Sequence, residues 1–428
     1  MRNRILVFMM LMSFLGTTDA QNSLHLSLKE AQTYALEHNR SLKNASMDVQ
    51  ISAASRWQTL ATLLPQVSAN VDYSNMFGYK MNLGEFQISM PNSMTYGATA
   101  SVALSGAQVV GVQLEKMAGQ MADITLKQTE QEVADQVKTL YYSALVMEET
   151  VRLLEKNLEH LNQLMVFTER SVEVGVSEQT DADLISVQVA SMKTNINANR
   201  RSLEMIYNSM RLQLGLEVDA EIMLSETIDG LMSANSGISL LGEGFVLDNN
   251  YNYQLLRQNV SLAQKQVTLK KWAYAPSLSA FYQYSEKEYF SDEATMNSTP
   301  PNMFGLSLNI PLFSSGSRQQ AVKEARLGYQ KQLNTFEDTR ESLLIQHRQL
   351  SYNLSSSYES FETQKKNMVV VQRVFDNISR KYEQGMASSL DITQSGSELI
   401  AAQSSYVQAL LEVVRAQIEL ETLLNLEG

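Results

Sequence analysis

The sequence contains two stretches in which a basic residue is followed five positions later by Gly and, six positions after that, by Asp. They read RSVEVGVSEQTDADL at residues 170–184 and RKYEQGMASSLDITQ at residues 380–394, and both lie within long helical sequence. Glycine tolerates the positive φ at which helices commonly end. Gly175 and Gly385 therefore predict that two long helices break in the same way.

The carboxylates that follow these breaks, Asp181 and Asp391, are the side chains with the clearest electrostatic chemistry. A carboxylate at the start of a helix accepts hydrogen bonds from free backbone N–H groups and meets the positive end of the helix dipole. The spacing therefore predicts that each Asp caps the helix after its break.

Catalytic or metal chemistry is not indicated. The four histidines are scattered without ligand spacing, there is no Cys, and no nucleophile motif, phosphate-binding loop or catalytic carboxylate pair is recognisable. We interpret the 22 methionines as packing residues of helical seams rather than ligands of a soft metal. We therefore expect no enzyme activity, no catalytic residue, no metal site and no cofactor.

The net charge of -12 argues against nucleic acid as a partner.

The first 20 residues have the pattern of a secretory signal peptide. Arg2 and Arg4 precede an apolar run of about 12 residues, which is too short for a membrane-spanning helix, and Thr18-Asp19-Ala20 supplies small residues at a cleavage position. No later segment has 18 continuous apolar residues. We therefore expect an exported protein whose role in a membrane, if it has one, uses β-strands.

The remaining sequence is a tandem repeat. Pro65 aligns with Pro276, and Tyr96-Gly97 aligns with Phe304-Gly305, at an offset that stays between about 208 and 211 along the chain. Each copy predicts a helix, two strands, a very long helix, a break and another long helix. The division that follows is a signal peptide at 1–20, a first repeat at 21–217, a linker or equatorial segment at 218–247 and a second repeat at 248–428.

The very long helices have heptad patterns, which predict helices packed side by side. The pattern in the second repeat is weaker, because His347, Ser357 and Gln364 are polar. In the first repeat only Thr168 is polar among the twelve positions, which are Val133, Val137, Leu140, Ala144, Met147, Val151, Leu154, Leu158, Leu161, Met165, Thr168 and Val172. About 60 residues of helix would span on the order of 90 Å, as in a coiled-coil rod or a helical tube.

Four segments alternate between apolar and small polar residues, near 65–74, 95–104, 277–285 and 303–311. Each has about the ten residues of a tilted membrane strand, with one face for lipid and one for water. A soluble sandwich has the same period. The expected apolar face comprises Val67, Ala69, Val71, Tyr73, Ala98, Ala100, Val102, Leu104, Leu278, Ala280, Tyr282, Tyr284, Phe304, Leu306, Leu308 and Ile310.

Four strands cannot enclose a lumen, since the smallest membrane barrels have about eight, and open strand edges are not tolerated in lipid. Several chains must therefore share one barrel, and three chains would supply twelve strands. The fold class expected is mainly α with β, with two tandem copies of helix, strand, strand, long helix and helix in each chain. A homotrimer would form a 12-stranded β-barrel that an α-helical barrel continues.

The mature sequence resembles the TolC-type outer-membrane efflux family along essentially its whole length. The resemblance rests on LSLKEAQTYALEHNRSL, the paired strand segments, IPLFSSGSRQQAVKEA and the two Gly-x(5)-Asp breaks. It implies a passive outer-membrane exit duct with a helical barrel in the periplasm of a Gram-negative bacterium. The implied partners are two further copies of the chain, outer-membrane lipid, a periplasmic adaptor (membrane fusion) protein and an inner-membrane transporter such as a proton-driven efflux pump.

The resemblance also implies that the two breaks form a periplasmic gate. Tyr382 matches a gating tyrosine, and three copies of Asp391 would form a carboxylate ring that favours cations. Ala387 stands where some relatives carry Arg, and Gln394 where some carry a second Asp, so closure by salt bridges and a second acidic ring are not expected. The gate residues are Asp391, Tyr382, Asp181, Gly175, Gly385 and Gln394, and the adaptor contacts are Val174, Val176, Met386 and Ala387.

Two alternatives remain open at the level of sequence. A type I protein secretion duct differs from a small-molecule efflux duct only in its partner. A secreted coiled-coil scaffold protein would keep residues 65–74 and 302–311 in water, whereas a channel would place them in lipid.

Overall fold

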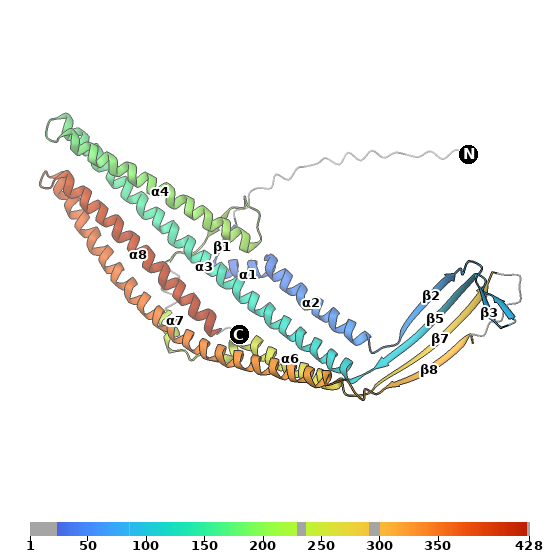
Figure 1. Ribbon diagram of the computed structural model, residues 1–428. Helices are drawn as coiled ribbons and strands as arrows, with labels where there is room; N and C mark the ends of the chain where they lie inside the picture. Colours follow the sequence, from blue (N-terminus) through green and yellow to red (C-terminus); the bar gives the residue numbers. More distant parts are fainter. Residues whose placement is uncertain (1–23, 85, 229–236, 291–299, 426–428) are drawn as a thin grey trace, which may run out of the picture. The chain divides into compact units, whose positions relative to one another are not determined.

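The computed structural model describes residues 24–84, 86–228, 237–290 and 300–425 (Figure 1). The expected signal peptide at residues 1–20 lies outside the described residues. Among the helices of these ranges, none combines the length and the hydropathy that a membrane span requires.

The two halves of the chain contain helices of matched length. The short helices α2 and α6 have 22 residues each, the long helices α3 and α7 have 68 and 67, and the helices after the breaks have 36 each. The predicted order of elements in the tandem repeat is therefore confirmed. The bounds are α2 (Arg40–Ala61), α3 (Gly106–Glu173), α4 (Gln179–Leu214), α6 (Tyr251–Trp272), α7 (Ser317–Glu383) and α8 (Ser389–Leu424).

Two strands from each half form one antiparallel sheet in the order β2-β5-β7-β8 (Figure 1). Directly opposed residues share a face of a sheet, and Val67, Ala100, Tyr282 and Phe304 lie opposite one another across the four strands. The register thus gathers the expected apolar positions on one face. Within the described residues, β2 pairs only with β5 and β8 only with β7, so the sheet has two open edges. The strands are β2 (Gln66–Ser74), β5 (Ser93–Leu104), β7 (Ser277–Tyr289) and β8 (Asn302–Asn309).

The sequence did not predict the hairpin of β3 (Lys80–Leu83) and β4 (Phe86–Ser89), which lies between β2 and β5. Four-residue strands are too short for alternation to stand out. Strand β7 also continues to Tyr289, beyond the expected end near 285, where it pairs with the start of β5 at Ser93. Alternation of apolar residues fades there, although the backbone pairing continues.

The chain folds into two compact units, each of which takes segments from both repeats. Unit 1 comprises residues up to 40, 132–242 and 351–420, and unit 2 comprises residues 41–131, 243–350 and from 421 onward. The sheet and helices α2 and α6 belong to unit 2, whereas α4 and nearly all of α8 belong to unit 1. The division into domains by repeat describes sequence similarity and stays a prediction.

Short elements join the ends of the repeats within unit 1. Strand β1 (Leu24–Leu26) pairs in parallel with β6 (Ile222–Leu224), and α1 (Leu28–His38) follows β1. The buried Tyr141 hydroxyl donates to the Leu26 carbonyl at 2.9 Å. Part of the linker 218–247 is thereby held against the start of the chain. Its 3-10 helix η1 (Gly237–Gly242) also belongs to unit 1, while η2 (Leu247–Asn249) belongs to unit 2.

Two helical hairpins, α3–α4 and α7–α8, pack together in unit 1, and their turns lie side by side (Figure 1). Both hairpins contribute side chains to one buried cluster, and burying each large apolar side chain stabilises the unit by about 1.5–3 kcal/mol. The cluster comprises Leu154, Leu161, Leu164, Ile185, Val189, Met192, Ile196, Phe375, Tyr382, Ile392 and Leu399. This packing positions the two glycine-containing turns next to each other.

Candidate functional site: the paired turns of unit 1

The two turns have the same backbone geometry. Gly175 and Gly385 have φ of 77° and 71°, in the region where residues with a Cβ are strained. After Gly175, the Val176 N–H donates to the Ser171 carbonyl at 2.8 Å, and the Met386 N–H donates to the Lys381 carbonyl at the same distance. These bonds close each helix with a Schellman motif. Each glycine therefore ends a long helix while keeping its last carbonyl groups hydrogen-bonded.

The carboxylates after the turns cap the next helices. The Asp391 carboxylate accepts from the Ser388 backbone N–H at 2.9 Å and from its hydroxyl at 2.8 Å, while the Asp391 N–H donates to the Ser388 hydroxyl oxygen at 3.1 Å. In the first repeat, the Asp181 carboxylate accepts from the Glu178 N–H at 3.1 Å. Both Asp residues thus satisfy a donor at a helix N-terminus, in the manner of a capping box.

The Asp391 carboxylate is exposed and held in its charged form by the cap. Hydrogen bonds from the Ser388 backbone and side chain lower the pKa of Asp391, because they favour the anion. Asp391 therefore carries a negative charge at neutral pH.

Tyr382 joins the two hairpins through Thr168, and both side chains are buried. The Thr168 hydroxyl donates to the Leu164 carbonyl at 2.9 Å and lies 2.7 Å from the Tyr382 hydroxyl. Because Thr168 has one hydroxyl proton, the Tyr382 hydroxyl is the donor between them. Burial raises the pKa of Tyr382, and the nearby charge of Asp181 raises it further, against the effect of the Thr168 bond. Tyr382 is therefore a protonated donor.

Asp181 and Gln188 add two contacts between the hairpins. The Ser389 hydroxyl, at the start of α8, donates to the Asp181 carboxylate at the start of α4. The Gln188 amide donates to the Thr393 carbonyl at 3.2 Å. Asp181 therefore links the hairpins while it caps its own helix, whereas within the described part of the chain the hydrogen bonds of the Asp391 carboxylate all come from Ser388.

The expected adaptor contacts divide into two groups. Val174, Val176 and Met386 are exposed by 74%, 80% and 66%. Ala387 instead packs against the buried cluster of the hairpins. Gln394, which was expected at the gate, is exposed and donates to Glu398 on its own helix at 2.9 Å. The three exposed apolar side chains leave a surface at the turns that is available for contact.

Sequence reasoning did not assign the partners Thr168, Ser389 and Gln188 to the site. A signal was present for Thr168, since it is the single polar residue in an apolar heptad pattern. Ser389 and Gln188 had no such signal, because polar residues near a turn or on a helix surface are common. Their roles depend on the contact between two hairpins that are far apart in sequence.

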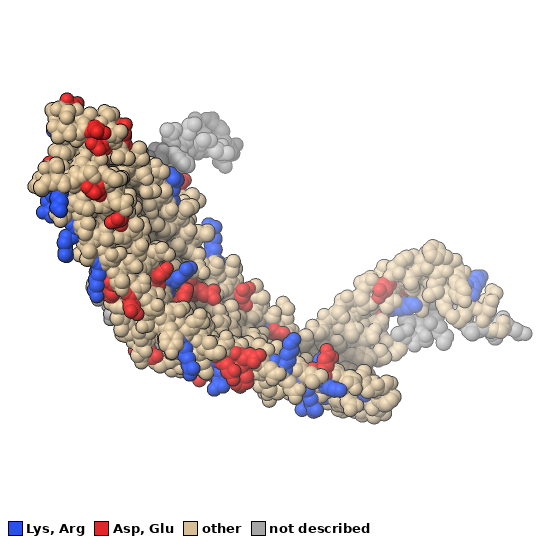
Figure 2. All heavy atoms as spheres, turned by 60° about the vertical axis from the view of Figure 1, so that its left-hand side comes forward, with Lys and Arg blue, Asp and Glu red and all other residues tan. Residues whose placement is uncertain are grey.

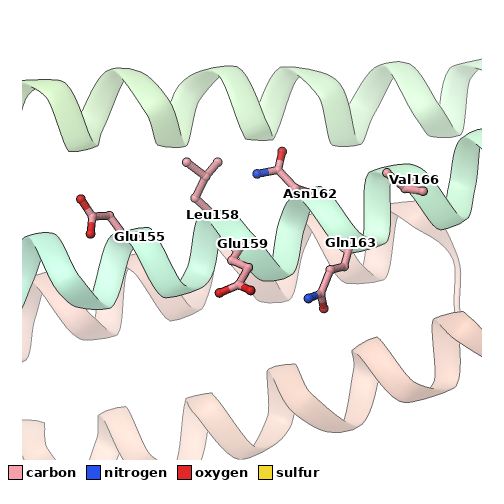
Figure 3. Close-up of a pocket in the computed structure, with 6 residues that line it drawn as sticks. All are labelled: Glu155, Leu158, Glu159, Asn162, Gln163 and Val166. Carbon is pink, nitrogen blue, oxygen red and sulfur yellow. The ribbon is translucent and has the colours of Figure 1, made fainter.

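A groove of about 630 Å3 on α3 is lined by Glu155, Leu158, Glu159, Asn162, Gln163 and Val166. Figure 3 shows Leu158 and Asn162 pointing to one side of the helix and Glu159 and Gln163 to the other. The polar groups do not converge on one point. The groove therefore has the character of a packing surface along a helix rather than of a pocket for a small ligand.

A family profile and two known proteins match most of the sequence. The sequence profile described as outer membrane efflux protein matches residues 33–216 and 246–426. The outer membrane protein TolC of Escherichia coli is 21% identical, over 98% of this chain and 85% of that protein. A probable efflux pump outer membrane protein of Pseudomonas putida, TtgC, is 20% identical over 92% of this chain and 82% of that protein.

Solved structures share the fold. The crystal structures of CusC, described in terms of folding and transmembrane channel formation, align with a TM-score of 0.77 at 18% identity, covering 93% of this chain and 91% of that chain. The outer membrane protein VceC of Vibrio cholerae aligns with a TM-score of 0.73 at 14% identity, covering 93% and 96%.

Proposed function

Because the chain belongs to the outer membrane efflux protein family, we propose that it is the passive exit duct of a tripartite efflux system. The family consists of channel proteins of the outer membrane, and the duct serves the export of small molecules. The chain would extend from the outer membrane into the periplasm. Energy for transport would come from a partner.

The sheet is the observation that carries this proposal. It has one apolar face and two open edges, β2 and β8, each with unpaired backbone groups. Unpaired backbone groups cost several kcal/mol each in lipid, so a membrane sheet must close on itself. Three copies joined edge to edge would close a barrel of twelve strands, and the helical hairpins would continue it as a tube.

The mass of the detergent-extracted protein tests this arrangement. Light scattering, corrected for bound detergent, should give the mass of three mature chains for material recovered from the outer-membrane fraction. A monomer in the soluble fraction would contradict the channel and leave the coiled-coil scaffold as the working hypothesis.

The paired turns of unit 1 would act as the periplasmic gate. The contacts from Tyr382 to Thr168 and from Ser389 to Asp181 hold the two hairpins of one chain together, and we assign this paired arrangement to the closed gate. The gate would open either when these bonds break and the hairpins separate, or when both hairpins of a chain swing outward as a pair. Ala387 offers no charge for closure by salt bridges.

The exposed carboxylate of Asp391 would set the charge preference of the opening. Three copies around the axis would form an anionic ring, which attracts cations and repels anions. The same group also caps α8, so capping and selection would be combined in one side chain.

The exposed apolar residues at the turns, Val174, Val176 and Met386, would contact the periplasmic adaptor protein. An adaptor helix that packs on them would remove apolar surface from water at about 25 cal/mol per Å2. An inner-membrane transporter, such as a proton-driven pump, would complete the system.

A further inference from the structure

The helix ends next to the sheet differ in charge between the two repeats. We compare the fifteen residues of each helix that lie nearest to the sheet. In the first repeat, residues 47–61 of α2 and 106–120 of α3 contain two basic residues and two acidic residues. In the second repeat, residues 258–272 of α6 and 317–331 of α7 contain Glu324 and seven basic residues, which are Lys265, Lys270, Lys271, Arg318, Lys323, Arg326 and Lys331.

We refer to these basic residues together as the α6–α7 basic surface. Its two helices lie side by side, since Tyr253 of α6 and Phe336 of α7 have ring centroids 5.0 Å apart. On the face drawn in Figure 2, several Lys and Arg side chains lie where the helices of unit 2 approach the sheet. A local charge of +6 in a chain of net charge -12 is a concentrated positive field.

Five of the seven basic side chains are exposed and have no partner among the described residues. They make no side-chain hydrogen bond and no ion pair within 4.0 Å, and they are Lys270, Lys271, Lys323, Arg326 and Lys331. Lys265 and Arg318 are engaged, with Gln113 and with the loop before α7. The exposed cations are therefore available to a partner.

Helix stability does not account for the cations of α7. They lie in its first four turns, and its first turn contains no acidic residue. The positive end of the helix dipole acts only within about the first turn, where it disfavours Arg318, and it gives the later cations no stabilisation. An external negative charge would stabilise Lys323, Arg326 and Lys331 by direct attraction.

The apolar neighbours of these cations indicate the kind of partner. The loop between β8 and α7 exposes Leu312 by 90% and Phe313 by 86%. Arg318 holds this loop, since it donates to the Pro311 carbonyl at 2.8 Å and lies over the Tyr274 ring at 5.2 Å. Trp272 is also partly exposed. Aromatic side chains next to Lys and Arg are typical of the interface between a membrane and water.

We propose that the α6–α7 basic surface binds the anionic headgroups of phospholipids in the leaflet of the outer membrane that faces the periplasm. Leu312 and Phe313 enter the edge of the hydrocarbon, while Lys270, Lys271, Lys323 and Arg326 contact phosphate groups. This inference rests on the proposed function, because it requires that the sheet spans the outer membrane. It assigns lipid binding to the second repeat alone.

Binding is tested with purified full-length protein in a neutral detergent. Phosphatidylglycerol or phosphatidylcholine is added to the micelles, and native mass spectrometry and the unfolding temperature report bound lipid and stabilisation. We expect a preference for phosphatidylglycerol that falls as salt is added, because the Debye length is only about 10 Å at 0.1 M. Inorganic phosphate at the same concentration should give no stabilisation.

Matched double variants locate the surface. Lys270→Gln with Lys271→Gln, and Lys323→Gln with Arg326→Gln, should each lower the preference for phosphatidylglycerol by about thirtyfold, since each cation near an anionic membrane surface contributes about fivefold to binding. Arg56→Gln with Lys116→Gln removes two exposed cations from the first repeat and should leave the preference unchanged. Equal binding of both lipids by the native protein, or an equal loss in all three variants, would overturn the proposal.

The mass and conductance of the same samples separate this inference from the proposed function. A conducting trimer without lipid preference overturns only the lipid surface. A protein that forms no trimer and no channel overturns the proposed function, and the lipid surface with it.

Discussion

Tyr382 and Thr168 are a polar pair at the end of an apolar seam, and their position makes the gate testable at single side chains. Tyr382→Phe removes the donor but leaves Thr168 bonded to the Leu164 carbonyl. Loss of one such bond costs about 1 kcal/mol. If the bond helps to hold the gate shut, we expect a higher resting conductance in planar bilayers.

Tyr352→Phe is the matched control for this experiment. Tyr352 is on the same helix and is 75% exposed, so loss of its hydroxyl should not alter conductance. An unchanged conductance in Tyr382→Phe, or an equal change in both variants, would contradict a gating role for Tyr382.

Asp391 and Asp181 are equivalent in sequence but differ in their contacts, so they can be compared directly. Asp391→Asn should reduce cation preference in single-channel current, because each of three copies loses a charge at the opening. Asp181→Asn weakens a cap and the bond to Ser389, and we expect a change in resting conductance with a smaller change in selectivity. Unchanged selectivity in Asp391→Asn would leave that residue only its capping role.

Acidification should affect the cap of α8 in a defined direction. Hydrogen bonds from Ser388 lower the pKa of Asp391 in the folded protein, so the stabilisation is present above the ordinary carboxyl pKa of about 4 and is lost as pH falls through the lower folded value. We expect cation preference to persist on acidification to about pH 4 and to decline below it. A decline near neutral pH would show that another group controls selectivity.

The sequence predicted where the candidate site lies along the chain, but it did not predict most of the contacts between the two hairpins. The Gly and Asp spacing predicted both turns, because positive φ and helix capping restrict residue type locally. The contacts of Thr168, Ser389 and Gln188 were missed, because hydrogen bonds between separate hairpins leave no local pattern. Ala387 packs against the buried cluster, and its predicted contact with an adaptor stays a prediction.

Among the helices, the turn after α7 depends on a glycine with φ of 71°. An L-residue in this conformation costs about 1–2 kcal/mol, so Gly385→Ala should loosen the turn. The amide hydrogens of Gly385 and Met386, which bond to Tyr382 and Lys381 carbonyls, should exchange faster with deuterium in the variant.

Gly328→Ala is the control at a helical position. Gly328 lies within α7, its φ is not positive, and the space that an alanine Cβ would occupy is open, so alanine should stabilise the helix by about 0.5–1 kcal/mol. Slower exchange at the turn in Gly385→Ala than in the native protein would contradict the requirement for positive φ.

Regular elements were predictable where they are long enough for a period to be visible. Heptads and period-two alternation identified α3, α7 and the four main strands, because burial on one face imposes those periods. The β3–β4 hairpin has too few residues to show a period. Division into units was also not predictable, since each unit combines segments from both repeats.

For the molecule as a whole, the apolar face of the sheet should contact lipid and the opposite face should contact water. Ala280 lies on the apolar face and Ser279 on the opposite face. The chain contains no Cys, so Ala280→Cys and Ser279→Cys each introduce a single thiol. In reconstituted bilayers, a water-soluble maleimide should label Ser279→Cys and spare Ala280→Cys.

Both thiols should react fully after unfolding in urea, which controls for intrinsic reactivity. Equal labelling of the two variants in bilayers would place both faces in water and contradict a membrane-spanning sheet.

The buried core of unit 1 combines residues of both repeats, and this has a consequence for how the exported chain folds. Leu154 and Ile185 are buried together with Phe375 and Leu399, which lie between 190 and 245 positions later in the chain. Contacts so distant in sequence form slowly, and the α3–α4 hairpin must keep its apolar face exposed until α8 has been translocated. Such a surface invites aggregation. We therefore expect the α3–α4 hairpin to depend on a holdase chaperone until α8 becomes available to cover it.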